Sequence, residues 1–261
     1  ITCFDRKTER ELGGAYAELS SLGVSWSLGE SYLRPLPGFP TIFLTPGMKK
    51  NLPEIAEARC RKALITTETA LFLDRCAARV CGITGSAGKT TTSTLLGLML
   101  RESLPGTEVY VGGNIGSVLI EEVDSIPPQA LVVLELSSFQ LQLASKSPEV
   151  AILLNVRPNH LDIHDSFDEY VRAKEKIYKS QTWSDLCILN LDDPLTRAMA
   201  SECKGRVAFF TLQPQAAERQ IAKGSAVAWL QDGELLQSSG DAVVHLARAE
   251  QHLVPGRHNI A

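Results

Sequence analysis

Short apolar runs alternate with amphipathic segments along most of the chain. The runs have the length of buried strands, and the segments between them carry apolar residues at the three- and four-residue spacing of a helix. The predicted strands are residues 41–44, 63–66, 78–83, 108–111, 130–136, 149–156 and 186–191, and the predicted helices are residues 9–22, 52–62, 93–101, 115–123 and 167–179. Regular alternation of strands and helices indicates an α/β protein with a parallel sheet.

The pattern changes after residue 206. Short strand-like runs occupy residues 207–211, 226–231 and 234–237, and Asp232-Gly233 lies between the last two as a hairpin turn. We therefore expect a small antiparallel β appendage in this part of the chain.

The first residues, Ile1-Thr2-Cys3-Phe4, form an apolar run that ends in Asp5-Arg6-Lys7 without any preceding segment, so we interpret this start as truncated. A Gly/Pro-rich stretch extends to Pro40, and residues 67–78 lead into the next predicted strand. We place a domain boundary after residue 67, which gives domains 1–67 and 68–261.

Composition narrows the classes of partner. The chain has 261 residues, of which 44% are hydrophobic and 21% charged, and its net charge of −4 has no basic excess that would attract nucleic acid. No apolar run is long enough to span a bilayer, and the first residues have no signal-peptide pattern. We expect a cytoplasmic protein without nucleic-acid or membrane partners. The six cysteines are scattered along the chain, which favours buried thiols in a reducing compartment.

A glycine-rich turn, Gly82-Ile83-Thr84-Gly85-Ser86-Ala87-Gly88-Lys89-Thr90-Thr91-Thr92, connects a predicted strand to a predicted helix. Such a loop cradles nucleotide phosphates with its N–H groups, while Lys89 adds a positive charge and Thr90 offers a hydroxyl to Mg²⁺. The first Gly of the common phosphate-loop pattern would fall at Ile83, but the Gly-Lys-Thr end is intact. The loop, with Gly85, Ser86, Ala87, Gly88, Lys89, Thr90 and Thr91 as candidate phosphate contacts, predicts a protein that uses ATP or GTP.

Glu135 lies near the end of the predicted strand 130–136 and is followed by Ser137-Ser138. A strand-end acid is by itself more often a solvated residue. Beside a phosphate loop, however, a carboxylate at the carboxyl end of a buried strand is well placed to hold Mg²⁺.

The residues of three further segments allow more than one interpretation. Residues 155–165 (NVRPNHLDIHD) offer His160, Asp162, His164 and Asp165 as metal ligands or, alternatively, as caps of the helix beginning near Phe167. Lys174 lies in a charge-rich helix, where a solvated face is the usual role. Gly112-Gly113-Asn114-Ile115-Gly116 either admits an anion to a helix N-terminus or is a tight connection.

These pieces, in this order, resemble the Mur ligases of peptidoglycan synthesis. The likeness covers essentially the whole chain and rests on GITGSAGKTTT at 82–92, GGNIG at 112–116, LELSSFQL at 134–141, LNVRPNHLD at 154–162, RAKEKIY at 172–178 and PGRHN at 255–259. LELSSFQL together with GGNIG favours the D-glutamate-adding branch of the family. The resemblance implies a partial Rossmann-like N-terminal domain and a P-loop α/β central ATPase domain.

The resemblance also implies roles for residues. Lys89 and Thr90 would bind ATP and a first Mg²⁺ ion held by Glu135, and His160 would help to hold a second Mg²⁺ ion. Lys174 would be the carbamylated lysine of the family, whose CO₂ adduct is an anion beside that metal. Asn114, Ser137 and Gln140 would orient the muramoyl-alanine end of the substrate, and Asn259 would contact adenine. The uridine diphosphate site of the family would be represented in this chain only by Asp5, Arg6, Lys7, Thr45, Pro46 and Gly47.

The reaction that the resemblance implies joins D-glutamate to UDP-N-acetylmuramoyl-L-alanine. The carboxylate of the UDP-linked substrate attacks the γ-phosphate of ATP, and the amine of D-glutamate then displaces phosphate from the acyl phosphate. Magnesium and Lys89 neutralise the charge that would otherwise keep two anions apart. We expect a monomer whose partners are these two substrates.

The sequence departs from the family pattern at Ala87, where Asn is usual, and at Ile163, where an Arg or aromatic residue is common. Family members also continue beyond the equivalent of Ala261 into a domain that binds the amino acid. The alternatives are another Mur-type ligase, or a nucleotide-binding module without ligase turnover in this form. A nucleotide-dependent switch would require a guanine-recognition motif such as N-K-x-D, which is missing from the sequence.

Overall fold

The computed structural model describes residues 1–114, 118–158, 164–240 and 242–248. The chain separates into two compact units, Ile1–Thr66 and Thr67–Ala261, one residue away from the boundary predicted after residue 67. His160, Asp162, Ile163 and Asn259 lie outside the described residues. Among the described residues, no helix combines the length and the apolar character that crossing a bilayer requires.

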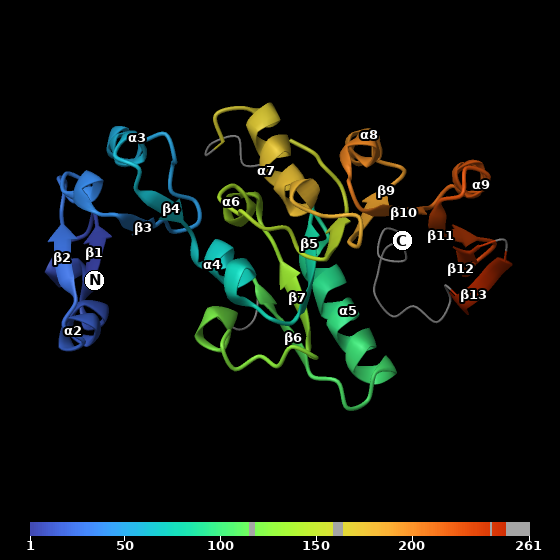
Figure 1. The fold of residues 1–261 in the computed structure, drawn as a ribbon, viewed down its shortest axis with the longest axis horizontal. Coiled ribbons are helices and arrows are strands. Elements are labelled where there is room, and N and C mark those ends of the chain that lie inside the picture. Colours follow the sequence, from blue (N-terminus) through green and yellow to red (C-terminus); the bar gives the residue numbers. More distant parts are fainter. Residues whose placement is uncertain (115–117, 159–163, 241, 249–261) are drawn as a thin grey trace. The chain divides into compact units, whose positions relative to one another are not determined.

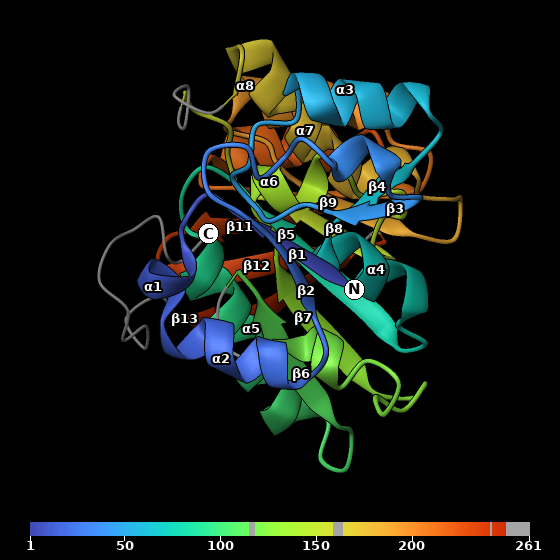
Figure 2. The ribbon, with the colours of Figure 1, turned by 90° about the vertical axis from the view of Figure 1, so that its left-hand side faces the viewer.

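The first unit contains two pairs of parallel strands (Figures 1 and 2). The elements are β1 (Thr2–Asp5), α1 (Glu9–Leu12), α2 (Gly14–Ser21), β2 (Ser25–Leu28), η1 (Leu36–Gly38), β3 (Thr41–Phe43), α3 (Pro53–Cys60) and β4 (Leu64–Thr66). The predicted helix 9–22 is divided at Gly13, whose φ of 55° is a left-handed conformation that interrupts a right-handed helix. Strand β2 lies in the Gly/Pro-rich stretch and was not predicted.

The second unit is built on one sheet of nine strands, in the order β13-β12-β11-β10-β9-β8-β5-β7-β6. The strands are β5 (Arg79–Thr84), β6 (Val109–Gly113), β7 (Leu131–Glu135), β8 (Val150–Leu153), β9 (Leu186–Asn190), β10 (Arg206–Thr211), β11 (Ala226–Gln231), β12 (Glu234–Ser239) and β13 (Ala242–Arg248). Strands β5 to β11 are parallel, which confirms the predicted α/β fold with a parallel sheet.

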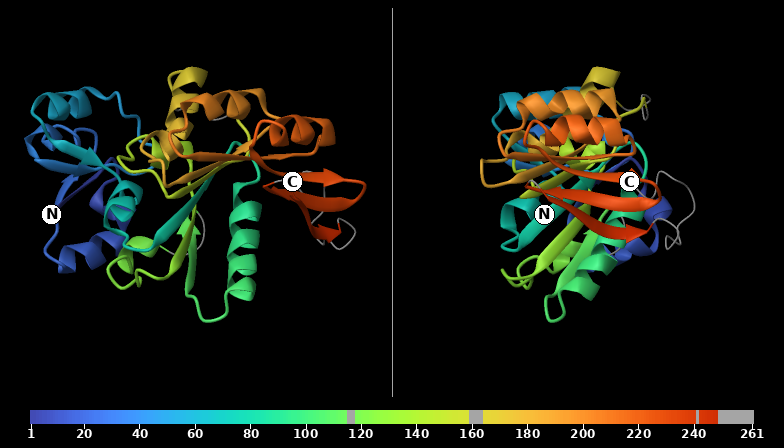
Figure 3. Two further views of the ribbon diagram at one scale, coloured as in Figure 1. Left: turned by 45° about the vertical axis from the view of Figure 1, so that its right-hand side comes forward. Right: turned by 90° about the vertical axis from the view of Figure 1, so that its right-hand side faces the viewer.

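Helices cover both faces of this sheet, with α5 on one face and α7, α8 and α9 on the other (Figure 3). The helices and 3₁₀ turns are α4 (Glu68–Arg75), α5 (Lys89–Ser103), η2 (Leu119–Glu121), α6 (Ser138–Leu141), α7 (Phe167–Lys179), α8 (Pro194–Met199), η3 (Ala200–Glu202) and α9 (Pro214–Ile221). The apolar core lies between the sheet and these helices and includes Val132, Leu134, Leu153, Ile177 and Leu189.

Two predictions for this unit, and one for the cysteines of the whole chain, need correction. The antiparallel appendage is limited to β12 and β13, because β10 and β11 are parallel strands that continue the main sheet; the predicted hairpin turn at Asp232-Gly233 is confirmed. The predicted helix 115–123 is, in its described part, only the 3₁₀ turn η2. The six cysteines are all free, but only Cys187 is buried; Cys60 is exposed, and Cys3, Cys76, Cys81 and Cys203 are partly buried.

Helix α4 was not predicted. Thr67 caps its N-terminus by accepting a hydrogen bond of 3.1 Å from the N–H of Ala70, and Ala70 and Leu73 are buried. A capping threonine followed by apolar residues three positions apart was the signal that could have revealed the helix. A helix of only eight residues, however, forms only with help from tertiary packing.

Candidate active site

The glycine-rich loop lies at the carboxyl end of β5, in the middle of the parallel sheet. Strand β5 leads to α5 on one face, whereas the neighbouring β8 leads to α7 on the other. Two adjacent strands whose connections diverge to opposite faces leave a crevice at their carboxyl ends, and this is where ligands bind in sheets of this type. The confirmed strand–loop–helix arrangement therefore puts the loop where a nucleotide is expected.

Gly88 makes the helix begin at the end of this loop. Its φ of 86° is left-handed, and α5 starts at Lys89, four residues earlier than the predicted start at Ser93. The first N–H groups of a helix have no acceptor within the helix, and the helix dipole favours an anion there. The start of α5 is therefore suited to phosphate. The Lys89 side chain folds back over the loop and donates a hydrogen bond of 3.0 Å from Nζ to the carbonyl oxygen of Gly85.

A carboxylate and a hydroxyl meet beside the loop. Thr90 Oγ1 donates a hydrogen bond of 2.7 Å to Glu135 Oε2, and Asn114 Nδ2 donates one of 3.0 Å to Glu135 Oε1. Glu135 is the last residue of β7 and is only 2% exposed. A hydroxyl and a carboxylate at this separation are hard oxygen donors of the kind that Mg²⁺ prefers, so these two residues fit the ion that the sequence predicted.

The second glycine-rich turn is a tight connection in its described part. Gly113 has a φ of 100°, and a Cβ atom there would overlap the carbonyl oxygen of Glu135. The N–H of Asn114 donates to the same carbonyl oxygen at 2.9 Å. The glycine thus lets β6 approach β7 closely enough for Asn114 to hold the Glu135 side chain. Residues 115–117 lie outside the described part.

Lys174 does not lie on a solvated face, contrary to the interpretation from its neighbours alone. It is 1% exposed, and its Nζ donates hydrogen bonds to the carbonyl oxygen of Gly85 at 2.9 Å and to Thr84 Oγ1 at 3.4 Å. It also lies 4.6 Å from the centre of the Tyr170 ring. Burial, and secondly the charge of Lys89, lower the pKa of the Lys174 amine from 10.5 to about 7. A substantial neutral fraction therefore exists at neutral pH.

Sequence reasoning missed several residues that hold the loop or the segment that follows β8. Asn155, which follows β8, and Tyr170 on α7 both form hydrogen bonds with it. Asp193 is 1% exposed, caps α8 and accepts a hydrogen bond of 3.0 Å from the N–H of Val156. The Asp-Pro pair at residues 193 and 194 was a visible helix-start signal. No local signal indicated that Asn155 would reach the loop.

Ser137 and Gln140 were predicted to orient substrate, and in this structure they bind each other. Together they form a capping box at the start of α6, in which Gln140 Oε1 accepts from the Ser137 N–H at 2.9 Å. Helix α7 is capped by Ser166, whose side chain accepts from the Glu169 N–H, so the described part of residues 155–165 does not supply that cap. His164 is buried, 2.9 Å from Ser138 Oγ and stacked on Phe139.

The remaining predicted residues lie in the first unit or outside the described residues. Asp5 ends β1, and its carboxylate accepts from the Lys7 N–H in the bend that follows; Thr45, Pro46 and Gly47 form a turn after β3. Both segments lie in the first unit. His160, predicted to hold a second metal ion, and Asn259, predicted to contact adenine, lie outside the described residues. Within residues 1–114, 118–158, 164–240 and 242–248, no group of three His, Cys, Asp or Glu side chains is arranged to hold a metal ion.

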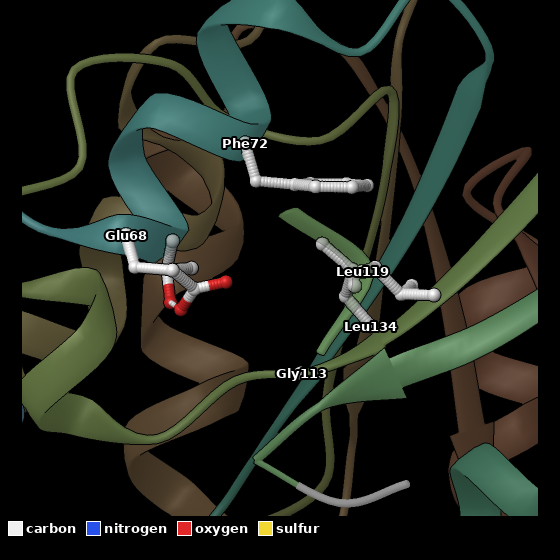
Figure 4. A pocket seen from close by; sticks show the side chains of 6 residues that line it. Glu68, Phe72, Gly113, Leu119 and Leu134 are labelled. Atoms are coloured by element: carbon white, nitrogen blue, oxygen red, sulfur yellow. Dashed lines mark hydrogen bonds between the residues drawn. The ribbon is translucent and has the colours of Figure 1, made fainter. Parts of the chain in front are cut away.

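A small cavity lies near the strand end that carries Glu135. It has a volume of about 10 Å³ and is lined by Glu68, Thr69, Phe72, Gly113, Leu119 and Leu134; Figure 4 shows these side chains around it. This volume holds about one water molecule, so the cavity is not a site for a nucleotide.

Comparison with known proteins agrees with this geometry. The profile of the Mur ligase middle domain matches residues 83–261. The chain is 48% identical to the UDP-N-acetylmuramoylalanine--D-glutamate ligase of Symbiobacterium thermophilum, covering 99% of this chain and 55% of that protein, and 41% identical to the enzyme of the same name from Acetivibrio thermocellus, covering 100% and 54%. The chain thus spans about half the length of these relatives.

A solved structure shows the same fold. A murein peptide ligase from Psychrobacter arcticus superposes with a TM-score of 0.51 at 15% identity and covers 99% of this chain and 56% of that one. The profile match over most of the chain, together with the phosphate loop and the strand-end carboxylate, shows that this chain belongs to the Mur ligase family, of which it contains the middle domain.

Proposed function

We propose that the protein is an ATP-dependent ligase that joins D-glutamate to UDP-N-acetylmuramoyl-L-alanine through an acyl phosphate. The observation that carries the proposal is the hydrogen bond between Thr90 at the start of α5 and Glu135 at the end of β7. This hydrogen bond joins the phosphate loop to the carboxylate that would bind the same Mg²⁺ ion. The substrate pair is taken from the name that the relatives bear, at up to 48% identity.

In this mechanism the chain holds an anionic phosphate so that an anionic carboxylate can approach it. The N–H groups at the start of α5 and the amine of Lys89 would bind the phosphates of ATP. Thr90 and Glu135 would hold Mg²⁺, which neutralises charge on the transferring phosphoryl group when it is bound. The γ-phosphoryl group passes to the substrate carboxylate, and the amine of D-glutamate displaces phosphate through a tetrahedral intermediate.

The surroundings of Lys174 support the proposal that this lysine carries a carbamate. Reaction with CO₂ requires a neutral amine, and burial beside Lys89 lowers the pKa of Lys174 to about 7. The carbamate would turn a buried cation into an anion facing the loop. We propose that this anion and His160 serve a second Mg²⁺ ion. Asn114, Ser137 and Gln140 are proposed to orient the muramoyl-alanine end, and Asn259 to contact adenine.

The first unit would bind the uridine diphosphate part of the substrate. Its candidates are the turn at Asp5, Arg6 and Lys7 and the turn at Thr45, Pro46 and Gly47, in which Gly47 has a φ of 83°. We propose that the protein acts as a monomer in the cytoplasm, and that neither membrane nor nucleic acid takes part.

The test measures phosphate release by the protein of the complete reading frame. We expect release that requires ATP, UDP-N-acetylmuramoyl-L-alanine and D-glutamate together. Release without D-glutamate dependence would contradict the specific assignment. The present chain, assayed in parallel, is expected to bind ATP, and ATP binding without turnover would identify it as a nucleotide-binding module.

A Lys89→Ala variant tests the phosphate site itself. We expect the loss of ATP binding in calorimetry, because the loop loses its positive charge. Lys179→Ala is the matched control, since that lysine on α7 pairs with Glu175 and Glu202 and lies away from the loop. Equal ATP affinity in both variants would exclude the phosphate-loop assignment.

A further inference from the structure

The carboxamide of Asn155 pairs with the phosphate loop as a peptide group would. Its Oδ1 accepts hydrogen bonds from the N–H of Ser86 at 3.1 Å and of Ala87 at 3.0 Å, and its Nδ2 donates to the carbonyl oxygen of Ala87 at 3.0 Å. The side chain thus satisfies both polar groups of one residue in the loop. This two-way pairing resembles one step of a strand ladder.

The backbone explains how the side chain reaches this position. Strands β5 and β8 are paired as far as Thr84 and Leu153. The pairing continues past the strands, because the N–H of Leu154 donates to Thr84 at 3.0 Å and the N–H of Ser86 donates to the Asn155 carbonyl oxygen at 2.9 Å. The Asn155 carboxamide extends this contact by one residue, to Ala87.

Ser86 adds a second attachment to the same segment. Its hydroxyl accepts a hydrogen bond of 2.8 Å from the N–H of Arg157, lies 3.0 Å from the Arg157 carbonyl oxygen and is 2.9 Å from the hydroxyl of Tyr170. The first half of the loop is therefore attached to the segment after β8 and to α7. Its second half, from Gly88 into α5, keeps the N–H groups that have no acceptor within the helix.

We infer that Asn155 is a positioning residue that holds residues 85–87 in the phosphate-binding shape before ATP arrives. The inference rests on the proposed ATP site. Because the N–H groups of Ser86 and Ala87 are engaged, phosphate recognition falls to the N–H groups from Gly88 onward and to Lys89. A loop that is already ordered loses less conformational entropy when the nucleotide binds, so this arrangement increases affinity.

The same contacts account for Ala87, where the family usually has Asn. The Ala87 side chain is exposed, and Asn155 holds only its backbone N–H and carbonyl groups. The shape of the loop thus depends on the Ala87 peptide and not on the side chain at that position. We expect Ala87→Asn to leave both the loop and its affinity for ATP unchanged.

The test is amide hydrogen exchange of the nucleotide-free protein, followed residue by residue by NMR, together with calorimetry of ATP binding. In Asn155→Ala we expect the Ala87 amide, which loses its side-chain acceptor, to exchange about tenfold faster, and ATP affinity to fall by about tenfold. The Ser86 amide keeps the Asn155 backbone carbonyl oxygen as an acceptor, so its exchange should change less. Asn190→Ala is the matched control: Asn190 is the last residue of β9, and its carboxamide donates to the Leu154 carbonyl oxygen at 2.7 Å without touching the loop. It should leave both measurements near wild type.

Asn155→Asp separates the hydrogen bonds and serves if the Ala variant does not fold. The carboxylate still accepts from Ser86 and Ala87, so their slow exchange should persist, while the Ala87 carbonyl oxygen loses its donor and ATP binds more weakly. Unchanged exchange in Asn155→Ala, or unchanged ATP affinity in both Asn155 variants, would overturn the inference. If no variant or wild type binds ATP, the proposed function fails, whereas the exchange rates still report on Asn155.

Discussion

Lys89 and Lys174 donate hydrogen bonds to one atom, the carbonyl oxygen of Gly85, at 3.0 and 2.9 Å. Two amines that share an acceptor lie close enough to repel each other when both are charged. Lys89 is the more exposed of the two, so the buried Lys174 is the one whose charge is disfavoured. The loop thus presents one cation and one readily neutralised amine to the space beside it.

A first prediction concerns the pH dependence of stability. Lys174 has a pKa of about 7 in the folded chain against 10.5 when unfolded, so between these values the unfolded chain binds more protons. The free energy of unfolding should therefore rise through this window by a few kcal/mol, and the cost of the buried cation is largest below pH 7. Urea unfolding at pH 6.5 and pH 9 measures the rise. Lys174→Met should lack this contribution, and an equal rise in both proteins would refute it.

A second prediction concerns the carbamate. Lys174→Ala should abolish ligase activity in the complete protein, and small carboxylates such as acetate should restore part of it by occupying the place of the missing anion. Lys176→Ala, on the exposed side of the same helix, is the control and should retain activity. Full activity of Lys174→Ala in phosphate-release assays would contradict the assignment.

A third prediction separates the charge of Glu135 from its hydrogen bonds. In Glu135→Gln the amide can still accept from Asn114 and donate to Thr90, so the free energy of unfolding should change by less than about 1 kcal/mol. The dependence of ATP affinity on Mg²⁺ should nevertheless be lost, because the neutral amide is a poor ligand. Calorimetry with and without Mg²⁺ decides this. Glu149→Gln is the control, since Glu149 accepts from Val80 at the opposite end of β5.

The sequence predicted long elements well and short ones poorly, for a physical reason. Helix α7 was predicted with its observed bounds, because its thirteen residues carry a sustained apolar stripe. The same stripe contained the clue to Lys174, which lies four residues after Tyr170 and four before Tyr178, both buried. The neighbouring charges pointed to a solvated face, whereas the spacing pointed to the core.

Short elements and strand order depend on contacts between distant residues. Helix α9 was overlooked, and without it β10 and β11 were predicted to belong to an antiparallel appendage. With a crossover helix between them they are parallel. The site shows the same limit. The loop and Glu135 were visible in the sequence as local patterns, but Asn155 meets Ala87 only because β8 lies beside β5 in the folded sheet.

A fourth prediction tests the close approach of β6 to β7. Gly113→Ala should reduce the free energy of unfolding by about 3 kcal/mol, because the new Cβ adds a clash with the Glu135 carbonyl oxygen to the strain of a left-handed residue. Gly106→Ala is the matched control: its φ is 92°, yet nothing lies within 4 Å of its added Cβ, so only about 1 kcal/mol of strain is expected. Equal losses in urea unfolding would show that the approach is not tight.

A fifth prediction compares two tyrosines on α7. Within the part of the chain that the structure describes, the buried hydroxyl of Tyr178 has no hydrogen-bond partner, whereas that of Tyr170 lies 2.9 Å from Ser86 Oγ. Removing an unpaired buried hydroxyl relieves its desolvation, so Tyr178→Phe should be neutral or stabilising by about 1 kcal/mol. Tyr170→Phe removes a hydrogen bond and should destabilise the protein by about 1 kcal/mol.

Because only Tyr170 of the two touches the phosphate loop, only Tyr170→Phe should also speed hydrogen exchange at the Ser86 amide. Urea unfolding together with exchange by NMR distinguishes the two variants, and a loss of stability in Tyr178→Phe as large as that in Tyr170→Phe would mean that the Tyr178 hydroxyl is paired in solution.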